Sequence, residues 1–190
     1  MLLRQRAALL PRRDRDGRRP FRVTRRLELT GWPYSRSQLA GGPGPNDADG
    51  RADDPYNDCL PTSVAAVIEY LRDVSVAPDA IRDWAYGDGT HGYTEPGPVV
   101  PYLAVYGIGY EHRITGLPLP VIDEALSRGW PLLAWTHEPA GYYHWTPVTG
   151  CGDGQVIRHQ VYGGYCETLA EADWLSRYQG WLIVIREAKS

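Results

Sequence analysis

The chain has 190 residues, of which 43% are hydrophobic and 23% charged, and this composition predicts one folded domain with a sizeable core. Its net charge of −3 argues against a protein that binds nucleic acid through bulk charge. No apolar run approaches the ~18 residues that a membrane-spanning helix needs. Three cysteines without a CxxC pair argue against a disulfide framework and a structural zinc site, but leave open a bond between Cys151 and Cys166.

The charge is uneven along the chain. Residues 1–26 contain ten arginines and two aspartates, a charge near +8, so the remaining residues carry near −11. We predict a basic arm without fixed structure over 1–26 and one folded domain over 27–190. Such an arm could bind nucleic acid, a phosphate surface or an acidic partner, although a solvated terminus is the commoner case. Arginines interrupt its apolar stretch, unlike a secretory signal, which predicts a cytoplasmic location, with phage association or another export route as the alternative.

The first predicted elements are a strand, a long loop and a helix. Alternating residues predict a strand over Val23–Leu29, and residues 40–58 are dense in Gly, Pro, Asp and Asn, which predicts a loop. Asp58 is a candidate N-cap, and Pro61 is tolerated in the first helical turn. Apolar residues then recur at helical spacing from Val64 to Leu71, which predicts a helix with one buried face.

The remaining elements alternate short helices with strands. Helices are predicted at 77–86, 99–106 and 119–127, with a short strand at 110–114. Three strand-like runs follow at 130–137, 144–151 and 155–162, the last two joined by a Gly-Asp-Gly hairpin turn. A late helix over 168–178, with Thr168 and Glu171 as a capping box and Gly180 as its stop, precedes a closing strand at 181–187. This order predicts an α+β fold with a mostly antiparallel sheet.

Cys59 is the best-placed candidate nucleophile. It lies at the start of the predicted helix, where the partial positive charge of the helix N-terminus favours a thiolate. A thiolate becomes a useful nucleophile when a histidine beside it exchanges protons. Cys151 ends a predicted strand and Cys166 follows a loop. For any one cysteine, the ordinary alternative is a small buried hydrophobic residue.

Among five histidines, His144 has the most favourable context. It begins the strand "HWTPVTG", which would hold it rigidly, and Trp145 beside it could shield it from water. His159 lies in the next strand of the predicted hairpin. The other three are expected on the surface or in loops: His91, His112 and His137.

A Cys-His pair in acyl transfer also needs donors for the oxyanion and a group that orients the imidazole. The backbone N–H of Cys59 can be one donor, and the side-chain amides of Gln38 and Asn57 are candidates for the other. The candidates for the orienting group are His159, Gln160 and Asp153. The aspartate is the poorest of these, since "GCGDGQ" reads as a turn in which aspartate is a favoured residue.

Five stretches carry a family resemblance when they are taken in order. They are "PYSRSQL", "NDCLPTSVAAVIEYL", "SRGWPLLAW", "HWTPVTG" and "TLAEADWLSRYQGWLIVI", and they span roughly residues 30–186. Together they resemble the papain-like cysteine peptidases related to the bacteriocin-processing domains of bacteria and phages. The resemblance implies a papain-like fold, in which the nucleophile opens a central helix and the histidine lies on the facing sheet.

Position by position, the resemblance implies Cys59 as nucleophile, His144 as general base and acid, and Gln38 as the oxyanion-hole amide. The Gly/Pro/Asp loop would then be an insertion. Two positions depart from the family pattern: Leu60 stands where a glycine is common, and Gln160 stands where an orienting aspartate is usual. The oxygen of Gln160 could still hold the imidazole, but a neutral amide supports an imidazolium less well than a carboxylate.

The sequence therefore predicts a cysteine peptidase that cleaves a peptide or isopeptide bond in a peptide or protein substrate. The Gln160 departure keeps open a catalytically weak peptide-binding module of the same fold, and related chemistry keeps open an acyltransferase or cell-wall amidase. Nucleic-acid binding through the arginine-rich arm is a further alternative. The mechanism requires no cofactor. The acidic loop 46–58 could bind a divalent cation, but its Asp spacing does not follow a calcium-loop pattern, so we expect no metal.

Overall fold

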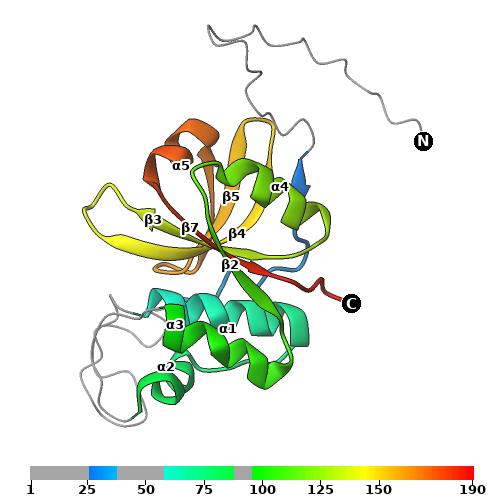
Figure 1. Cartoon of the computed structure of the whole chain (residues 1–190), viewed down its shortest axis with the longest axis vertical. Coiled ribbons are helices and arrows are strands. Elements are labelled where there is room, and N and C mark those ends of the chain that lie inside the picture. The colour runs from blue at the N-terminus through cyan, green and yellow to red at the C-terminus, as the bar shows by residue number, and fades with distance from the viewer. Residues whose placement is uncertain (1–25, 38–57, 88–95) are drawn as a thin grey trace, which may run out of the picture.

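The computed structural model describes residues 26–37, 58–87 and 96–190 (Figure 1). The predictions for Gln38, Asn57 and His91, for most of the basic arm and for most of the 40–58 loop lie outside the described residues. No helix among the described residues is long and apolar enough to cross a membrane. All three cysteines are free, so the bond between Cys151 and Cys166 is not formed.

The described residues form one seven-stranded sheet in which every pairing is antiparallel. Its main path runs β2-β7-β3-β4-β5-β6, and β1 pairs with β4 beside that path. The strands are β1 (Leu27–Glu28), β2 (Tyr110–Ile114), β3 (Leu132–His137), β4 (Tyr143–Gly152), β5 (Gln155–Gln160), β6 (Tyr165–Ala170) and β7 (Tyr178–Ile185). The α+β class with a mostly antiparallel sheet is confirmed.

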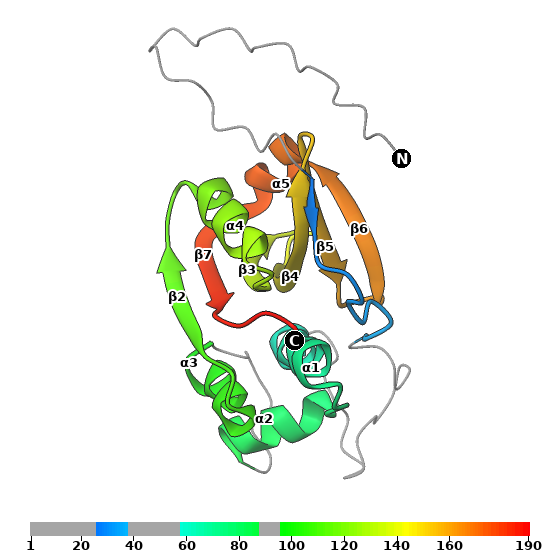
Figure 2. The same ribbon diagram turned by 90° about the vertical axis from the view of Figure 1, so that its right-hand side faces the viewer.

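The helices form two groups around this sheet. The first group is α1 (Cys59–Arg72), α2 (Pro78–Tyr86), α3 (Pro96–Val99) and the 3₁₀ helix η2 (Val100–Tyr106). The second is α4 (Pro118–Ser127) and α5 (Glu171–Arg177). Figures 1 and 2 show α1, α2 and α3 together at one end of the molecule, with α4 and α5 beside the strands at the other. Helix α1 packs against β4, while α5 packs against β5 and β6.

Helix α1 confirms the helix that the apolar spacing predicted, and it is the central helix that the resemblance implied. Twelve of its 14 residues are buried, so it is surrounded by other elements rather than covered on one face. The small residues Ala65 and Ala66 have no exposed surface and allow close packing beside Val64 and Val67. The helix therefore presents its first residue, Cys59, from a rigid and enclosed position.

Strand pairing assigns neighbouring residues of β4 to opposite faces of the sheet, because side chains alternate along a strand. His144 is opposite Thr136 on β3, and Trp145 is opposite Trp135. The Trp145 ring packs against Trp135 and against Trp181 of β7. The tryptophan beside His144 therefore lies on the other face from the imidazole.

Three local predictions were wrong at the end of the chain. Thr168 belongs to strand β6, so it forms no capping box; α5 begins at Glu171, and its N-cap is Ala170. The cause is the pairing of β6 with β5, which takes this backbone into the sheet. Helix α5 ends at Arg177, and Gly180 lies inside β7 with a φ of 84° rather than stopping a helix.

Two further helices differ in detail from their predictions. The segment predicted as one helix over 99–106 is a short α-helix followed by a 3₁₀ helix that ends before Gly107. At the start of α1, Asp58 occupies the N-cap position without a capping hydrogen bond from its side chain. Its carboxylate oxygens lie 3.2 Å from Nη1 of Arg82, so the side chain joins α1 to α2 instead.

Candidate active site

Cys59 lies where the start of α1 meets strand β4. Its Sγ accepts a hydrogen bond from the backbone N–H of Trp145 at 3.5 Å, one residue after His144. The Ser63 hydroxyl lies 2.7 Å from the carbonyl oxygen of Cys59 and 3.1 Å from that of Trp145. One serine therefore holds the first turn of the helix against the strand that carries the histidine.

The Cys59 thiol is held in its neutral form. Burial raises its pKa to about 11, although the backbone N–H groups of Trp145 and Leu60 act in the opposite direction. The neighbouring Asp58 carboxylate adds to the increase. The helix start was expected to favour a thiolate, but here the loss of hydration outweighs the helix N-terminus.

The imidazole of His144 is oriented by Gln160. The Nε2 of His144 and the Oε1 of Gln160 are 2.7 Å apart, and because the amide oxygen only accepts, Nε2 must carry the proton. That tautomer leaves Nδ1 as the basic nitrogen. Burial lowers the pKa of His144 to about 4, so the ring is neutral at pH 7 even though the Gln160 bond acts to raise the pKa.

A tyrosine shields the imidazole. The Tyr142 ring meets the His144 ring edge to face, with centroids 5.7 Å apart, and His144 is only 2% exposed. Sequence reasoning gave this shielding to Trp145, which packs on the opposite face of the sheet. The tyrosine could not be identified beforehand because its position depends on the turn between β3 and β4.

Of the three candidates for the orienting group, Gln160 is the one with a hydrogen bond to His144. The Nδ1 of His159 accepts from the indole N–H of Trp32 at 3.1 Å, and its Nε2 donates to the Arg36 carbonyl at 2.7 Å. Asp153 is exposed in the turn between β4 and β5, with a φ of 53°. The amide is thus the group beside the imidazole, where the family pattern would place a carboxylate.

A buried charge cluster lies on the face of the sheet that carries His144 and Gln160. Sequence reasoning missed this cluster. Arg158 has no exposed surface and pairs with Glu138 through two bonds of 2.6 and 2.9 Å. Nε of Arg158 also donates to Glu167 at 2.7 Å, and Arg177 reaches Glu138 at 3.1 Å. A usable signal existed: an arginine inside the apolar strand "VIRHQV", two residues before Gln160, shares its face.

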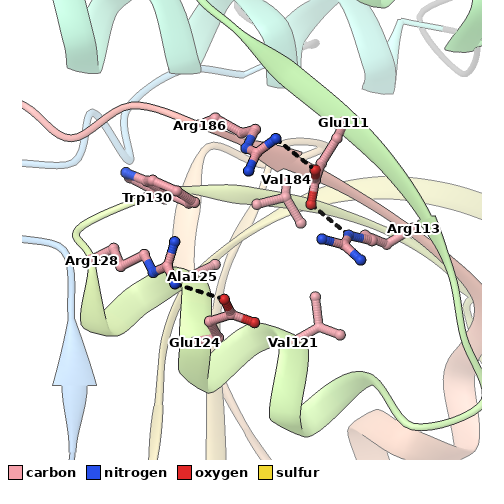
Figure 3. Close-up of a pocket in the computed structure, with 9 residues that line it drawn as sticks. All are labelled: Glu111, Arg113, Val121, Glu124, Ala125, Arg128, Trp130, Val184 and Arg186. Atoms are coloured by element: carbon pink, nitrogen blue, oxygen red, sulfur yellow. Dashed lines mark hydrogen bonds and ion pairs between the residues drawn. The ribbon is translucent and has the colours of Figure 1, made fainter.

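The described residues also form two cavities, one of which borders this charge cluster. One of about 330 Å³ lies between the β3 end and α5, lined by His137, Glu138, Pro139, Asp173, Ser176 and Arg177. A second, of about 60 Å³, is shown in Figure 3, where Arg113, Arg128 and Arg186 pair with Glu111 and Glu124 around Trp130. The second cavity shares no residue with the Cys59 and His144 region. Among the described residues, no group of three or more His, Cys, Asp or Glu side chains could hold a metal ion.

Two solved structures resemble this chain in fold. A protein described as a C39-like peptidase from Bacillus anthracis matches with a TM-score of 0.61 and 14% identity, over 87% of this chain and 100% of that chain. The peptidase domain of Streptococcus ComA, a bifunctional ABC transporter involved in a quorum-sensing pathway, matches with a TM-score of 0.57 and 15% identity, over 70% and 93%. No family model and no curated protein matches the sequence.

These likenesses define the fold. The chain shares the fold of these two peptidase structures, as the resemblance implied. At 14–15% identity this likeness shows the fold and assigns no role to any residue.

Proposed function

We propose that the protein is a cysteine peptidase that cleaves peptide or isopeptide bonds, with Cys59 as nucleophile and His144 as general base and acid. One observation carries the proposal. The Cys59 sulfur lies against the backbone of residue 145, while the Gln160 bond fixes the neighbouring imidazole with Nδ1 as its basic nitrogen. A thiol and a basic nitrogen placed on adjoining elements are the requirements of thiol catalysis.

The proposed reaction starts from a neutral pair. As Sγ of Cys59 attacks the substrate carbonyl carbon, Nδ1 of His144 takes the thiol proton, and the carbonyl oxygen becomes an oxyanion. The imidazolium then gives this proton to the leaving amine, which leaves an acyl-enzyme. Water next attacks the thioester carbonyl while His144 takes its proton, and return of that proton to sulfur releases the acid and restores the thiol.

Donors for the oxyanion are proposed from the helix start and from upstream. The first helical bond of α1 is from the N–H of Thr62 to the carbonyl of Asp58, so the N–H groups of Cys59 and Leu60 precede the helical ladder. Such groups suit an anion at a helix N-terminus. The amide of Gln38, from the "SQL" motif, is the proposed second donor.

A peptide electrophile that mimics the scissile carbonyl tests the proposal. A peptidyl vinyl sulfone should label Cys59 and spare Cys166, which is exposed and serves as the internal control. Cys59→Ala should abolish labelling and peptide hydrolysis, whereas Cys166→Ser should keep both. Tryptic mass spectrometry locates the adduct. Labelling of Cys166 in preference to Cys59 would contradict the proposal.

A peptide-binding module with weak catalysis is the second candidate. The observation that favours it is electrostatic: burial holds the Cys59 thiol and the His144 ring in their neutral forms, and Gln160 brings no charge. This candidate predicts peptide binding that Cys59→Ala leaves intact, together with no turnover by the unmodified chain. Fluorescence anisotropy of a labelled peptide measures the binding, and a peptide hydrolysis assay of the unmodified chain separates the two candidates.

A further inference from the structure

We propose that Glu138 is a positioning residue that supplies the negative charge for His144, so that two side chains share what one orienting carboxylate would do. Gln160 supplies the hydrogen bond, and Glu138 supplies the charge. The inference rests on the proposed function, because it assigns a role in the proton transfers of His144. It also explains how a site with a neutral orienting group can support an imidazolium.

Short contacts link the Glu138 carboxylate to the strand of His144. The Thr136 hydroxyl lies 2.8 Å from Oε1 of Glu138 and 3.1 Å from the carbonyl oxygen of His144, its partner across the β3–β4 pair. The backbone N–H of Glu138 donates to the Tyr142 carbonyl at 2.8 Å, and the Tyr142 ring covers the imidazole. Glu138 therefore cannot move without disturbing the groups that frame His144.

Glu138 keeps its charge although it is only 4% exposed. Burial acts to raise its pKa, but the bonds and charge of Arg158 outweigh burial and bring the pKa to about 2. Arg177 of α5 and the Thr136 hydroxyl add further donors. The carboxylate is therefore ionised at every pH at which the protein would work.

The Glu138 carboxylate raises the pKa of the His144 imidazole, and this effect is larger than the opposite effect of the Arg158 guanidinium. After burial, which lowers the pKa of His144, and the Gln160 bond, which raises it, the largest contribution is the increase caused by Glu138. Arg158 and His159 of β5 lower the pKa by smaller amounts. The guanidinium thus keeps Glu138 ionised without cancelling its effect on the ring.

The matched pair of variants is Glu138→Gln and Glu167→Gln. Both remove a carboxylate that binds Arg158, but Glu167 pairs with it from β6 and has no direct bond to the His144 frame. In a Cys59→Ala background, NMR of labelled histidine follows the protonation of His144. We expect its midpoint to fall by about one pH unit in Glu138→Gln and to stay within about 0.2 units in Glu167→Gln. In the active chain, kcat at pH 7 should fall about tenfold in Glu138→Gln.

An unchanged His144 midpoint in folded Glu138→Gln, or equal shifts in both variants, would overturn the inference. If Glu138→Gln does not fold, the double variant Glu138→Gln/Arg158→Gln removes both charges together. Its midpoint should lie below that of Arg158→Gln, which keeps the Glu138 carboxylate; a midpoint at or above that of Arg158→Gln also overturns the inference. The NMR measurement needs no turnover, so it separates failure of this inference from failure of the proposed peptidase activity.

Discussion

His144 and His159 lie on neighbouring strands, both are buried, and burial lowers the pKa of each to about 4. They differ in how their nitrogens are used. Both ring nitrogens of His159 form hydrogen bonds to the N-terminal segment, one with the Trp32 indole and one with the Arg36 carbonyl. In His144, Nε2 forms a hydrogen bond to Gln160, and Nδ1 has no hydrogen-bond partner among the described residues. Burial and a lowered pKa therefore do not distinguish the proposed catalytic histidine, His144, from His159; the ring nitrogen without a hydrogen-bond partner does.

The largest expected effect separates the two histidines by reactivity. His144→Ala should slow labelling of Cys59 by the peptide electrophile by about 10²–10⁴, because the thiol loses its general base. His159→Phe should keep the rate within about tenfold, because this ring lies outside the proton path. Time-resolved intact mass spectrometry gives both rates. Equal losses in two folded variants would break the comparison.

Acid should destabilise the protein through both histidines alike. The folded pKa of each is about 4 and the unfolded value is 6.5, so the unfolded chain binds more protons between these pH values. The free energy of unfolding is therefore unaffected by these histidines above pH 6.5. It falls as the pH drops toward 4, by about 3 kcal/mol for each histidine. Urea unfolding at pH 7.5 and 4.5 measures the loss. His159→Phe should remove about half of it, and a flat profile in the parent would contradict the burial of both rings.

At pH 7.5, His159→Phe should lower the free energy of unfolding by about 2 kcal/mol. Phenylalanine keeps a ring against Trp32 and Tyr34, but it leaves the indole N–H and the Arg36 carbonyl without their partner. The control is His137→Phe on the exposed end of β3, which should cost less than about 0.5 kcal/mol. Similar costs at the two positions would show that the His159 bonds contribute little.

Gln160→Glu should increase the difference between His144 and His159, because it adds a charge beside His144 alone. Glutamate has the same shape, and its charge beside Nε2 should raise the pKa of His144 and favour the thiolate–imidazolium pair. Labelling of Cys59 at pH 7 should become about tenfold faster. Gln155→Glu, at the exposed start of the same strand, is the control and should leave the rate unchanged. A slower rate in folded Gln160→Glu would mean that charge at this position does not assist the thiol.

Local sequence signals predicted the elements that hold the candidate site. Helical spacing after Cys59 predicted α1, and the strand pattern around His144 predicted β4. Gln160 was among three candidates, and its place two residues from Arg158 on one strand face fits its contact with the imidazole. The role proposed for Gln38 lies outside the described residues and stays a prediction.

What sequence reasoning missed depends on distant partners. Strand β6 forms by pairing with β5, and this pairing overrode the local helix signal at Thr168. The neutral state of Cys59 follows from its burial by the assembled fold, which a helix-start argument cannot measure. Glu138 and Arg158 are 20 residues apart in the chain and become partners only across the sheet.

The bond between Trp32 and His159 has a consequence for the order of folding. Its partners are separated by 127 residues. Tyr34 bonds to Thr149 across 115 residues, and Ser37 bonds to Tyr162 across 125. Contacts between residues so far apart form late in folding, because closing the long intervening loop costs chain entropy before the contact stabilises the fold. During synthesis, the segment that leads into "SQL" cannot dock until β4 and β5 have emerged. A nascent chain therefore remains without its complete candidate site until almost all of the domain has been made.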